Sequence, residues 1–291
     1  YLMAIVRSMG FNLITFVPVA MLISNWFVKK RTLLTGIAMA CSNLGGAVGN
    51  GVVSQIIARY GWRAAYVSAG SVSLVICLFA VVFLIKRSPE EYGEKHAMKQ
   101  PTFYLLCMVM FLTGFYITGV MNHVVTYLCG SGWDIGTAGV VMTFFTLAGI
   151  LGSFLGGVLL EKIGYAKGVM LGGAMLLLAV MCLILGSKNH VFAYIFAILL
   201  GLSGYMGILL PSQAVMNTLG ARDYASLYGL TYSFYLVGAS VSVPVIAVIS
   251  EKTGYLTAWT VIAAAIILIV GLHLKCIREG DKLKRQFTEY K

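Results

Sequence analysis

Residues 61–66 read Gly-Trp-Arg-Ala-Ala-Tyr, and residues 254–259 read Gly-Tyr-Leu-Thr-Ala-Trp. The pattern glycine-aromatic-x-x-alanine-aromatic therefore occurs twice, at a distance of 193 residues. At the same offset three further glycine or proline pairs coincide: Pro18 with Pro211, Gly36 with Gly229, and Gly45 with Gly238. Glycines and prolines occupy positions where backbones approach closely or bend, so these pairs indicate a repeated architecture. Accidental matching is the alternative, because the chain holds 33 glycines.

Long apolar segments surround both copies of the pattern. A helix that spans a membrane needs about 20 mostly apolar residues. Nine segments meet this condition: 1–27, 33–58, 64–85, 101–128, 135–160, 168–185, 191–215, 224–249 and 256–274. The predicted fold class is therefore all-α, a polytopic membrane protein with nine transmembrane helices.

The repeat predicts how these nine helices are arranged. The first three match the last three in the same orientation, six helices later, and the middle three have no partner. We therefore expect two parallel six-helix halves, as in two-halved secondary transporters, with three further helices before Tyr1. Tyr1 is not a methionine and an apolar stretch is already under way there, so we expect the chain to be a fragment.

The composition supports a membrane protein. Hydrophobic residues make up 59% of the chain and charged residues 11%, and the mean hydropathy is +0.90. Soluble domains have roughly 45–50% apolar and about 25% charged residues. These values exclude a soluble enzyme, a disordered chain and a collagen-like chain, and they leave lipid as the solvent.

The net charge of +11 is explained by the loops rather than by a nucleic-acid partner. When successive loops are assigned to alternate sides, sixteen of the 21 Lys and Arg residues fall on one side and four on the other, and Arg7 lies inside a segment. The side rich in Lys and Arg is the cytoplasm, and we expect the membrane to be the bacterial inner (plasma) membrane. The predicted parts are the remainder of the N-terminal half with three helices (1–85), a cytoplasmic linker (86–100), the C-terminal six-helix half (101–274) and a basic cytoplasmic tail (275–291).

No pattern of an enzyme or a metal site occurs in the sequence. The motifs HExxH, GxSxG and GxxxxGK[ST] are absent, and the six cysteines are scattered without a CxxC pair. All Asp and Glu residues lie at helix ends or in loops. We therefore expect no catalytic residue, no cofactor and no bound metal.

Several short motifs resemble one family of transporters, the major facilitator superfamily. The loop that follows segment 135–160 reads Gly157-x-x-x-Glu161-Lys162-x-Gly164-x-x-Lys167, which is similar to the cytoplasmic loop signature of that family. Further resemblances lie in Arg7-x-x-Gly10 and in residues 25–31, 36–38, 61–63 and 122–127. The last four are similar to the monocarboxylate and oxalate–formate antiporter branch. The resemblance implies a twelve-helix fold of which this chain holds helices four to twelve.

The same resemblance implies a gate at the cytoplasmic end. The signature residues Gly157, Glu161, Lys162, Gly164 and Lys167 are expected to form it, with the Glu161 carboxylate meeting a helix N-terminus or a base in one conformation and releasing it in the other. A carboxylate at a helix N-terminus is favoured by roughly 0.3–1 kcal/mol. The alternative is an ordinary solvated loop charge.

Two titratable side chains are candidates for contact with substrate. Arg7 carries a charge that costs at least about 2.5–3.5 kcal/mol at the bilayer centre unless it is paired or hydrated, which suits an anion-binding or proton-coupling role. The imidazole of His123 is a group that can exchange a proton during transport. The alternatives are that Arg7 extends to the outer surface or pairs with an upstream acid, and that His123 is an interfacial residue wetted by headgroups.

Polar aromatic side chains provide the remaining candidates. Tyr116, His123 and Tyr127 share one face of a predicted helix. The further binding candidates are Tyr205, Gln213, Tyr232 and Tyr235, since tyrosine offers an apolar wall with a hydroxyl. The alternative is hydrogen bonding between helices or an interfacial aromatic belt. Segments 135–160 and 224–249 contain no Lys or Arg, although the branch binds carboxylates with basic residues in these helices.

The function expected from these observations is secondary active transport by alternating access. The expected substrate is a small organic anion such as a monocarboxylate or dicarboxylate, moved as a symporter or antiporter with coupled protons or a counter-transported anion. The lipid bilayer is the other expected partner, and we expect a monomer. Two alternatives are efflux of multiple amphipathic compounds, and a membrane protein of signalling or assembly that transports nothing.

Overall fold

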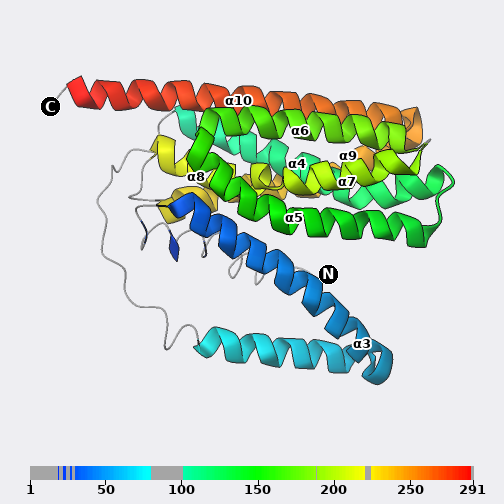
Figure 1. The fold of residues 1–291 in the computed structure, drawn as a ribbon. Helices are drawn as coiled ribbons and strands as arrows, with labels where there is room; N and C mark the ends of the chain where they lie inside the picture. Colours follow the sequence, from blue (N-terminus) through cyan, green and yellow to red (C-terminus); the bar gives the residue numbers. More distant parts are fainter. Residues whose placement is uncertain are drawn as a thin grey trace. The chain divides into compact units, whose positions relative to one another are not determined.

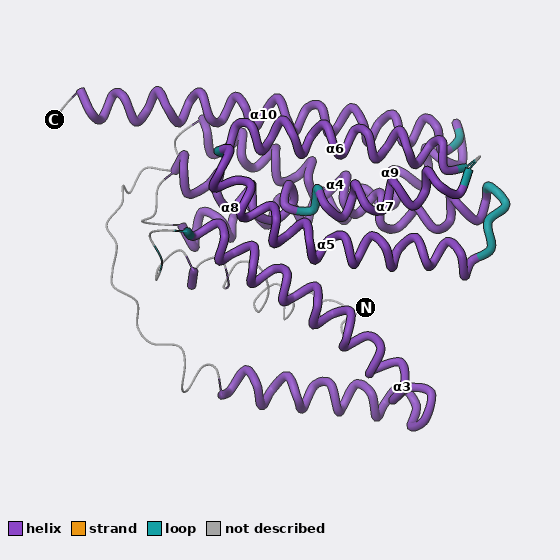
Figure 2. The backbone as a smooth tube through the Cα atoms, viewed as in Figure 1, coloured by secondary structure: helices purple, strands orange, loops and turns teal. Residues whose placement is uncertain are grey.

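The computed structural model describes residues 19, 22–23, 27, 30–79, 101–187, 189–219 and 224–289. The regular elements among these residues are all helices (Figures 1 and 2). They are α3 (Arg31–Phe79), α4 (Pro101–Gly130), α5 (Ile135–Ile163), α6 (Tyr165–Gly186), α7 (His190–Leu202), α8 (Tyr205–Leu219), α9 (Tyr224–Thr253) and α10 (Tyr255–Glu289). The chain divides into two compact units, residues 41–90 and the remainder, and each is described by itself.

The larger unit contains a bundle that matches the six predicted segments between residues 101 and 274. Among the described residues, five helices (α4, α5, α6, α9 and α10) are long and apolar enough to cross a membrane. The pair α7 and α8, bent by 41°, adds a sixth span if it crosses as one. The all-helical fold is therefore confirmed. The predicted helix 1–27 and linker 86–100 lie almost wholly outside the described residues.

The predicted helix 191–215 is divided at Ser203 and Gly204. Here the backbone N–H groups of Gly204 and Met206 donate to the carbonyls three residues earlier, those of Gly201 and Ser203, instead of four earlier. The Ser203 hydroxyl also donates to the Leu200 carbonyl. Glycine and serine are weak helix formers, and this local hydrogen bonding replaces the regular pattern of the helix. The predicted tail beyond residue 274 is, as far as Glu289, a continuation of α10.

The two copies of the repeated pattern have similar local structures. Gly61 interrupts α3 with a φ of 80°, and Gly254 separates α9 from α10 with a φ of 88°. Such positive φ angles are easily adopted only by glycine. The alanines of the two copies, Ala65 and Ala258, are both buried. Another pair, Gly36 and Gly229, differs: Gly36 packs closely against α5, whereas no described atom lies within 4 Å of a Cβ built on Gly229.

Close crossings between helices hold the bundle together. A Cβ added to Gly114 on α4 would overlap the carbonyl of Tyr235 on α9, and one added to Gly238 would overlap the carbonyl of Phe111. In the same way Gly152 of α5 lies against the backbone of α7. Small residues let helix backbones approach each other closely. In lipid the hydrophobic effect does not drive helices together, so such close packing is what makes them associate.

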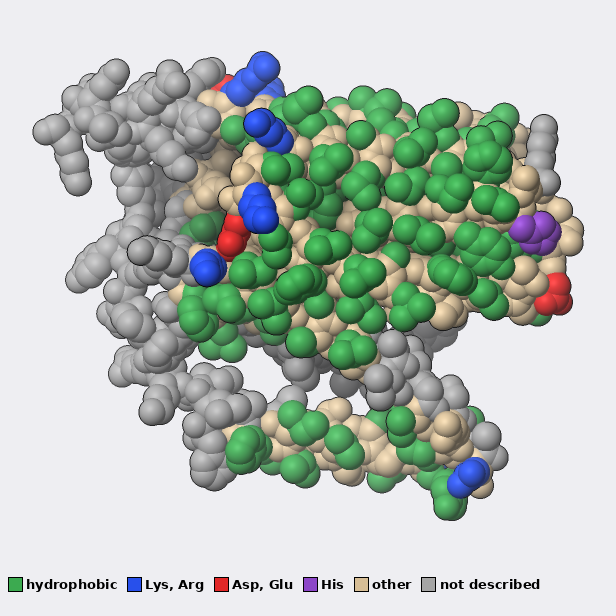
Figure 3. Space-filling model, in the orientation of Figure 1, with side chains coloured by type: hydrophobic (Ala, Val, Ile, Leu, Met, Phe, Trp, Pro, Cys, Tyr) green, Lys and Arg blue, Asp and Glu red, His purple; other side chains and the backbone are tan. Residues whose placement is uncertain are grey.

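The surface of the bundle is apolar between its two ends. Figure 3 shows hydrophobic side chains over the visible face, with Lys and Arg of the bundle gathered at the end from which the C-terminal part of α10 extends. The exposed basic residues at this end include Lys162, Lys167, Lys275 and Arg278. A contiguous apolar surface of this kind requires lipid around it.

Candidate functional site

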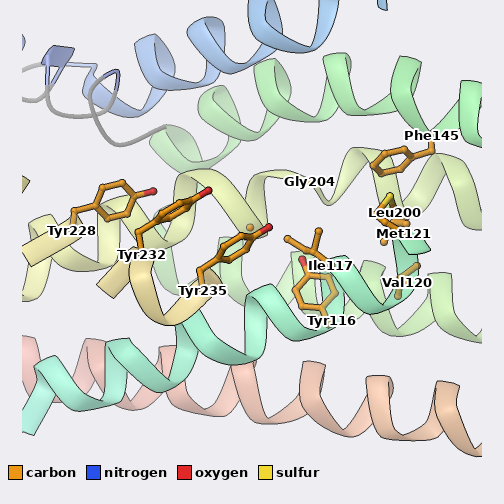
Figure 4. A pocket seen from close by; sticks show the side chains of 11 residues that line it. Tyr116, Ile117, Val120, Met121, Phe145, Leu200, Gly204, Tyr228, Tyr232 and Tyr235 are labelled. Atoms are coloured by element: carbon orange, nitrogen blue, oxygen red, sulfur yellow. The ribbon is translucent and has the colours of Figure 1, made fainter. Parts of the chain in front are cut away.

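A cavity of ≈ 210 Å³ lies inside the bundle, between α4, α5, α7, α8 and α9 (Figure 4). Its lining combines four tyrosines, two glycines and five apolar side chains. The lining residues are Tyr116, Ile117, Val120, Met121, Phe145, Leu200, Gly204, Gly207, Tyr228, Tyr232 and Tyr235. None of these is charged, so the described part of the cavity offers hydroxyl groups and apolar surface only.

One wall is formed by Tyr228, Tyr232 and Tyr235 of α9, which we call the tyrosine row. Their spacing of four and three residues places them on one face of a helix. The rings of Tyr232 and Tyr235 are stacked, with centroids 5.0 Å apart and planes 12° apart. The centroids of Tyr228 and Tyr232 are 6.1 Å apart. Figure 4 shows the three rings in succession with their hydroxyl ends on the same side, so the row presents a line of hydroxyls to the cavity.

Tyr116 comes to the cavity from the opposite helix, α4, and is 2% exposed. It stands next to the tyrosine row because α4 and α9 cross in backbone contact at Gly114 and Tyr235. The crossing therefore determines the separation between Tyr116 and the row.

The other end of the cavity is apolar. Val120 and Met121 of α4, Phe145 of α5 and Leu200 of α7 line it, and Figure 4 shows this group beyond Tyr235, away from Tyr228. Gly201, next to Leu200, lies so close to α5 that a Cβ there would be 2.5 Å from the Phe145 carbonyl. The close crossing of α5 and α7 thus brings Phe145 and Leu200 to the same end of the cavity.

The break between α7 and α8 also faces the cavity. Gly204 and Gly207 line it, and a Cβ built on Gly207 would be 2.5 Å from Cδ1 of Ile117. The lack of a side chain at Gly207 makes room for the Ile117 side chain, which itself lines the cavity.

The structure brings together three of the predicted binding residues, Tyr116, Tyr232 and Tyr235. His123 and Tyr127 are outside the cavity lining. Nε2 of His123 lies 3.2 Å from the Val243 carbonyl on α9, and the Tyr127 hydroxyl donates to the Ile184 carbonyl on α6 at 3.4 Å. Both rings also pack near α10, where Tyr127 lies 5.3 Å from Tyr255 between centroids.

The other predicted binding residues are also placed elsewhere. The hydroxyl of Tyr205 donates to the carbonyl of Gly168 on α6 at 2.9 Å, and its ring lies against Gly156. Gln213 lies half-buried on α8 and is not part of the lining. Arg7 is outside the described residues.

The predicted gate residues lie where α5 meets the beginning of α3, within the larger unit. Oε1 of Glu161 accepts a hydrogen bond from the backbone N–H of Leu33 at 3.2 Å. One turn earlier on α5, a Cβ built on Gly157 would be 3.0 Å from the Thr32 carbonyl. Gly164, with a φ of 81°, separates α5 from α6, and Lys162 and Lys167 are exposed on either side of it.

A buried hydrogen-bond cluster lies on the other side of this gate and was not predicted. The hydroxyl of Tyr165, directly after Gly164, is 2.6 Å from Nδ1 of His273 on α10 and 3.3 Å from the carbonyl of Leu210 on α8. Nε2 of His273 has no hydrogen-bond partner among the described atoms. Tyr165 therefore joins three helices at the point where the gate loop begins α6.

Most of the cavity lining is not predicted by the sequence. Tyr228 is indicated by its spacing to Tyr232, but the apolar residues Val120, Met121, Phe145 and Leu200 have no signal in the sequence. Their types are the same as those on the lipid-facing surface. No group of three or more His, Cys, Asp or Glu that could hold a metal occurs among the described residues.

Comparisons with known proteins agree with one another. A family model described as Major Facilitator Superfamily matches residues 1–129 and 104–290. The chain is 24% identical over 232 residues to "Uncharacterized MFS-type transporter YhjX" of Escherichia coli (strain K12), covering 74% of this chain and 56% of that protein. It is 28% identical over 268 residues to "Probable sulfoacetate transporter SauU" of Cupriavidus necator, covering 78% of this chain and 60% of that protein. The chain thus spans less than two thirds of the length of these relatives.

The fold also matches solved structures. A crystal structure of the Escherichia coli fucose:proton symporter FucP superposes with a TM-score of 0.69 at 13% identity. The superposition covers 90% of this chain and 72% of that chain. At this identity the likeness establishes the architecture of the helices.

Proposed function

The chain belongs to the Major Facilitator Superfamily, and we propose that it carries a small organic anion, such as a monocarboxylate or dicarboxylate, across the membrane by alternating access. Members of this superfamily are integral membrane transporters of small molecules rather than enzymes. The observation that carries the proposal is the internal cavity with its row of tyrosine hydroxyls. Hydroxyl groups donate hydrogen bonds to a carboxylate without placing a fixed charge in the membrane.

The name of one relative supports an anion as substrate. SauU is described as a probable transporter of sulfoacetate, which is a small organic anion. The fucose:proton symporter shows that a protein of this fold can couple transport to protons. For this chain we propose coupling to protons or to a counter-transported anion. His123 is the proposed proton-exchanging group.

The proposed binding residues are Tyr116, Tyr232 and Tyr235 in the cavity, together with Arg7. Substrate contact by Tyr127, Tyr205 and Gln213, which lie outside the described cavity lining, stays a prediction. The gate consists of Gly157, Glu161, Lys162, Gly164 and Lys167. We propose that it is closed when Glu161 binds the N-terminus of α3 and open when this contact is released.

The proposed orientation places the linker and the C-terminus in the cytoplasm, in a bacterial inner membrane, with the protein as a monomer. The gathering of Lys and Arg at one end of the bundle supports this orientation (Figure 3).

A second candidate is efflux of amphipathic compounds, and the uncharged lining of the cavity favours it. The two candidates differ in whether the site holds a fixed positive charge that neutralises the charge of the substrate. An anion carrier depends on Arg7 or His123, whereas an efflux transporter of lipophilic cations has no use for a fixed positive charge in the site.

Uptake by the whole protein reconstituted into proteoliposomes tests the proposal. Accumulation of a labelled organic anion is expected, and Arg7→Gln or His123→Ala should abolish it without loss of folded protein. Unchanged uptake by both variants would reject these two residues. Movement of lipophilic cations alone would favour efflux, and a complete lack of substrate-dependent flux would favour a protein that transports nothing.

A further inference from the structure

The two ends of the cavity differ in chemistry, and this difference indicates the kind of anion that fits. The tyrosine row lines one end with hydroxyls, and Val120, Met121, Phe145 and Leu200 line the other with apolar groups (Figure 4). A site with such unlike ends matches a molecule that is polar at one end and apolar at the other. This inference rests on the proposed function, because it concerns the substrate of the same site.

The tyrosine row places hydroxyl groups at one end of the cavity (Figure 4). Tyr232 and Tyr235 are stacked with planes 12° apart, so each ring has one face against the other, and Tyr228 is tilted by 49° from Tyr232. Phenolic hydroxyls donate hydrogen bonds to an acceptor such as a carboxylate. The hydroxyls of the row therefore suit the carboxylate of the proposed anion at this end.

The number of charges on the substrate is limited by the helices around the cavity. Segments 101–130, 135–160, 205–219 and 224–249 contain no Lys, Arg, Asp or Glu. A buried charge without a counter-charge is costly, and a second negative charge adds to that cost. Arg7, as the proposed counter-charge, and the hydroxyls of Tyr116 and the row would hold one carboxylate, whereas the second carboxylate of a dianion would meet no counter-charge on these segments.

The helix backbones at the apolar end lie close together. Gly201 lies against the Phe145 carbonyl, and this close approach brings Phe145 and Leu200 to the same end of the cavity. A preformed apolar pocket of this kind discriminates by the size and shape of an apolar group. Acetate or a similarly small anion would leave this end of the cavity empty.

We propose that the substrate is an amphipathic monocarboxylate. Its aromatic or branched apolar body lies among Val120, Met121, Phe145 and Leu200, and its carboxylate accepts hydrogen bonds from the tyrosine row. Phe145 is then a specificity-determining residue that discriminates between substrates by the size and shape of their apolar group. Tyr232 and Tyr235 discriminate by the chemistry of the charged end.

Binding of a small set of compounds to the whole purified protein tests this proposal. The reference compound is phenylacetate. Acetate lacks its phenyl group, succinate carries a second carboxylate, and 2-phenylethylamine carries a positive charge in place of the negative one. Thermal stabilisation gives an apparent affinity for each, and uptake of labelled phenylacetate into proteoliposomes is measured in parallel. Phenylacetate is expected to bind at least tenfold more tightly than the other three and to be transported.

Two matched pairs of variants locate the two ends of the substrate. Phe145→Ala is expected to reduce the preference for phenylacetate over acetate about tenfold or more, and Phe154→Ala on the exposed face of the same helix should leave it unchanged. Tyr232→Phe should weaken phenylacetate binding, whereas Tyr104→Phe, on an exposed side chain of α4, should not. Because the preference is a ratio within one variant, it is insensitive to partial unfolding, and Phe145→Leu serves where the alanine variant does not fold.

The outcomes separate this inference from the proposed function. If succinate or 2-phenylethylamine binds more tightly than phenylacetate, the inference is wrong and the site still binds a transported solute. If Phe145→Ala and Phe154→Ala have equal effects, the apolar body does not lie at Phe145 and the inference is again overturned. If the protein neither binds nor moves any of the three anions, anion transport itself fails, together with the inference that depends on it.

Discussion

Glu161 and Leu33 are joined by a hydrogen bond, in which the backbone N–H of Leu33 donates to Oε1 of the carboxylate at 3.2 Å. Leu33 lies in the first turn of α3, which begins at Arg31, so the negative charge meets the positive end of the helix dipole. The residues are 128 positions apart in the chain. The contact ties the end of α5 to the beginning of α3, and it can break without disturbing the inside of either helix.

Replacing Glu161 by Gln should weaken this contact. The loss of the charge removes roughly 0.3–1 kcal/mol of helix-dipole attraction, which corresponds to an opening equilibrium shifted about two- to fivefold. Thr32→Cys, at a buried position beside the contact, reports opening through its rate of alkylation in inside-out vesicles, in a background without other cysteines. Lys275→Gln, which removes one charge at an exposed position of α10 outside the gate, is the control. Equal alkylation rates in the Glu161→Gln variant and its parent would show that this hydrogen bond does not hold the gate.

Replacing Gly36 by Ala should also open the gate, for a steric reason. The added Cβ would be 2.6 Å from the carbonyl oxygen of Ser153, which belongs to a helix backbone and cannot rotate away. We expect faster alkylation at position 32 than in the parent protein. Gly45→Ala, where no described atom lies within 4 Å of the new Cβ, should leave the rate unchanged. A rate that rises equally in both variants would mean that helix propensity, and not the crossing of α3 with α5, is responsible.

Replacing Gly114 by Ala should disturb both the stability and the cavity. The new methyl group would overlap the Tyr235 carbonyl, so α4 and α9 must move apart at a cost of about 1–3 kcal/mol. The midpoint of thermal unfolding in detergent is expected to fall, and phenylacetate binding should weaken because Tyr116 moves away from the tyrosine row. Gly139→Ala on α5, where the space around the Cβ is open, serves as the control. An unchanged midpoint for Gly114→Ala would contradict the close crossing.

Replacing Tyr165 by Phe should destabilise the bundle at its gate end. The change removes the hydroxyl between His273 and Leu210 and leaves buried polar groups without this partner, which costs about 1–3 kcal/mol. Thermal unfolding is again the measurement, with Tyr104→Phe on an exposed side chain as the reference. If the two variants unfold at the same temperature, the hydroxyl of Tyr165 contributes nothing to the joint between α6, α8 and α10.

The fold was largely predictable because membrane helices have a strong signal. Five of the described helices (α4, α5, α6, α9 and α10) each correspond to an apolar segment long enough to span a bilayer, and α7 and α8 together correspond to a sixth. Such segments are recognisable because the backbone must satisfy its own hydrogen bonds in lipid. Gly61 and Gly254, which the repeated pattern pairs, both have positive φ angles in the structure. The break at Ser203 was missed because its glycines and serine fit equally well inside an apolar helix.

The site was less predictable because its apolar side chains resemble those that face lipid. Phe144 and Phe154 are exposed on α5, whereas Phe145 of the same helix lines the cavity, and the sequence does not distinguish the three. The direction of His123 depends on how α4 is rotated against α9, which is a property of packing between distant segments. The contact between Tyr165 and His273 spans 108 positions, so no local pattern predicts it.

Two connections between described helices consist of a single glycine each, and they restrict how the protein can change conformation. Gly164 is all that separates α5 from α6, and Gly254 is all that separates α9 from α10. A connection of one residue provides no extra length of chain, so neither helix of such a hairpin can slide along its axis past the other. A change of conformation that moves either hairpin must therefore keep the joined ends of its two helices together. Spin labels placed on either side of Gly254 should keep a constant separation when the protein changes conformation.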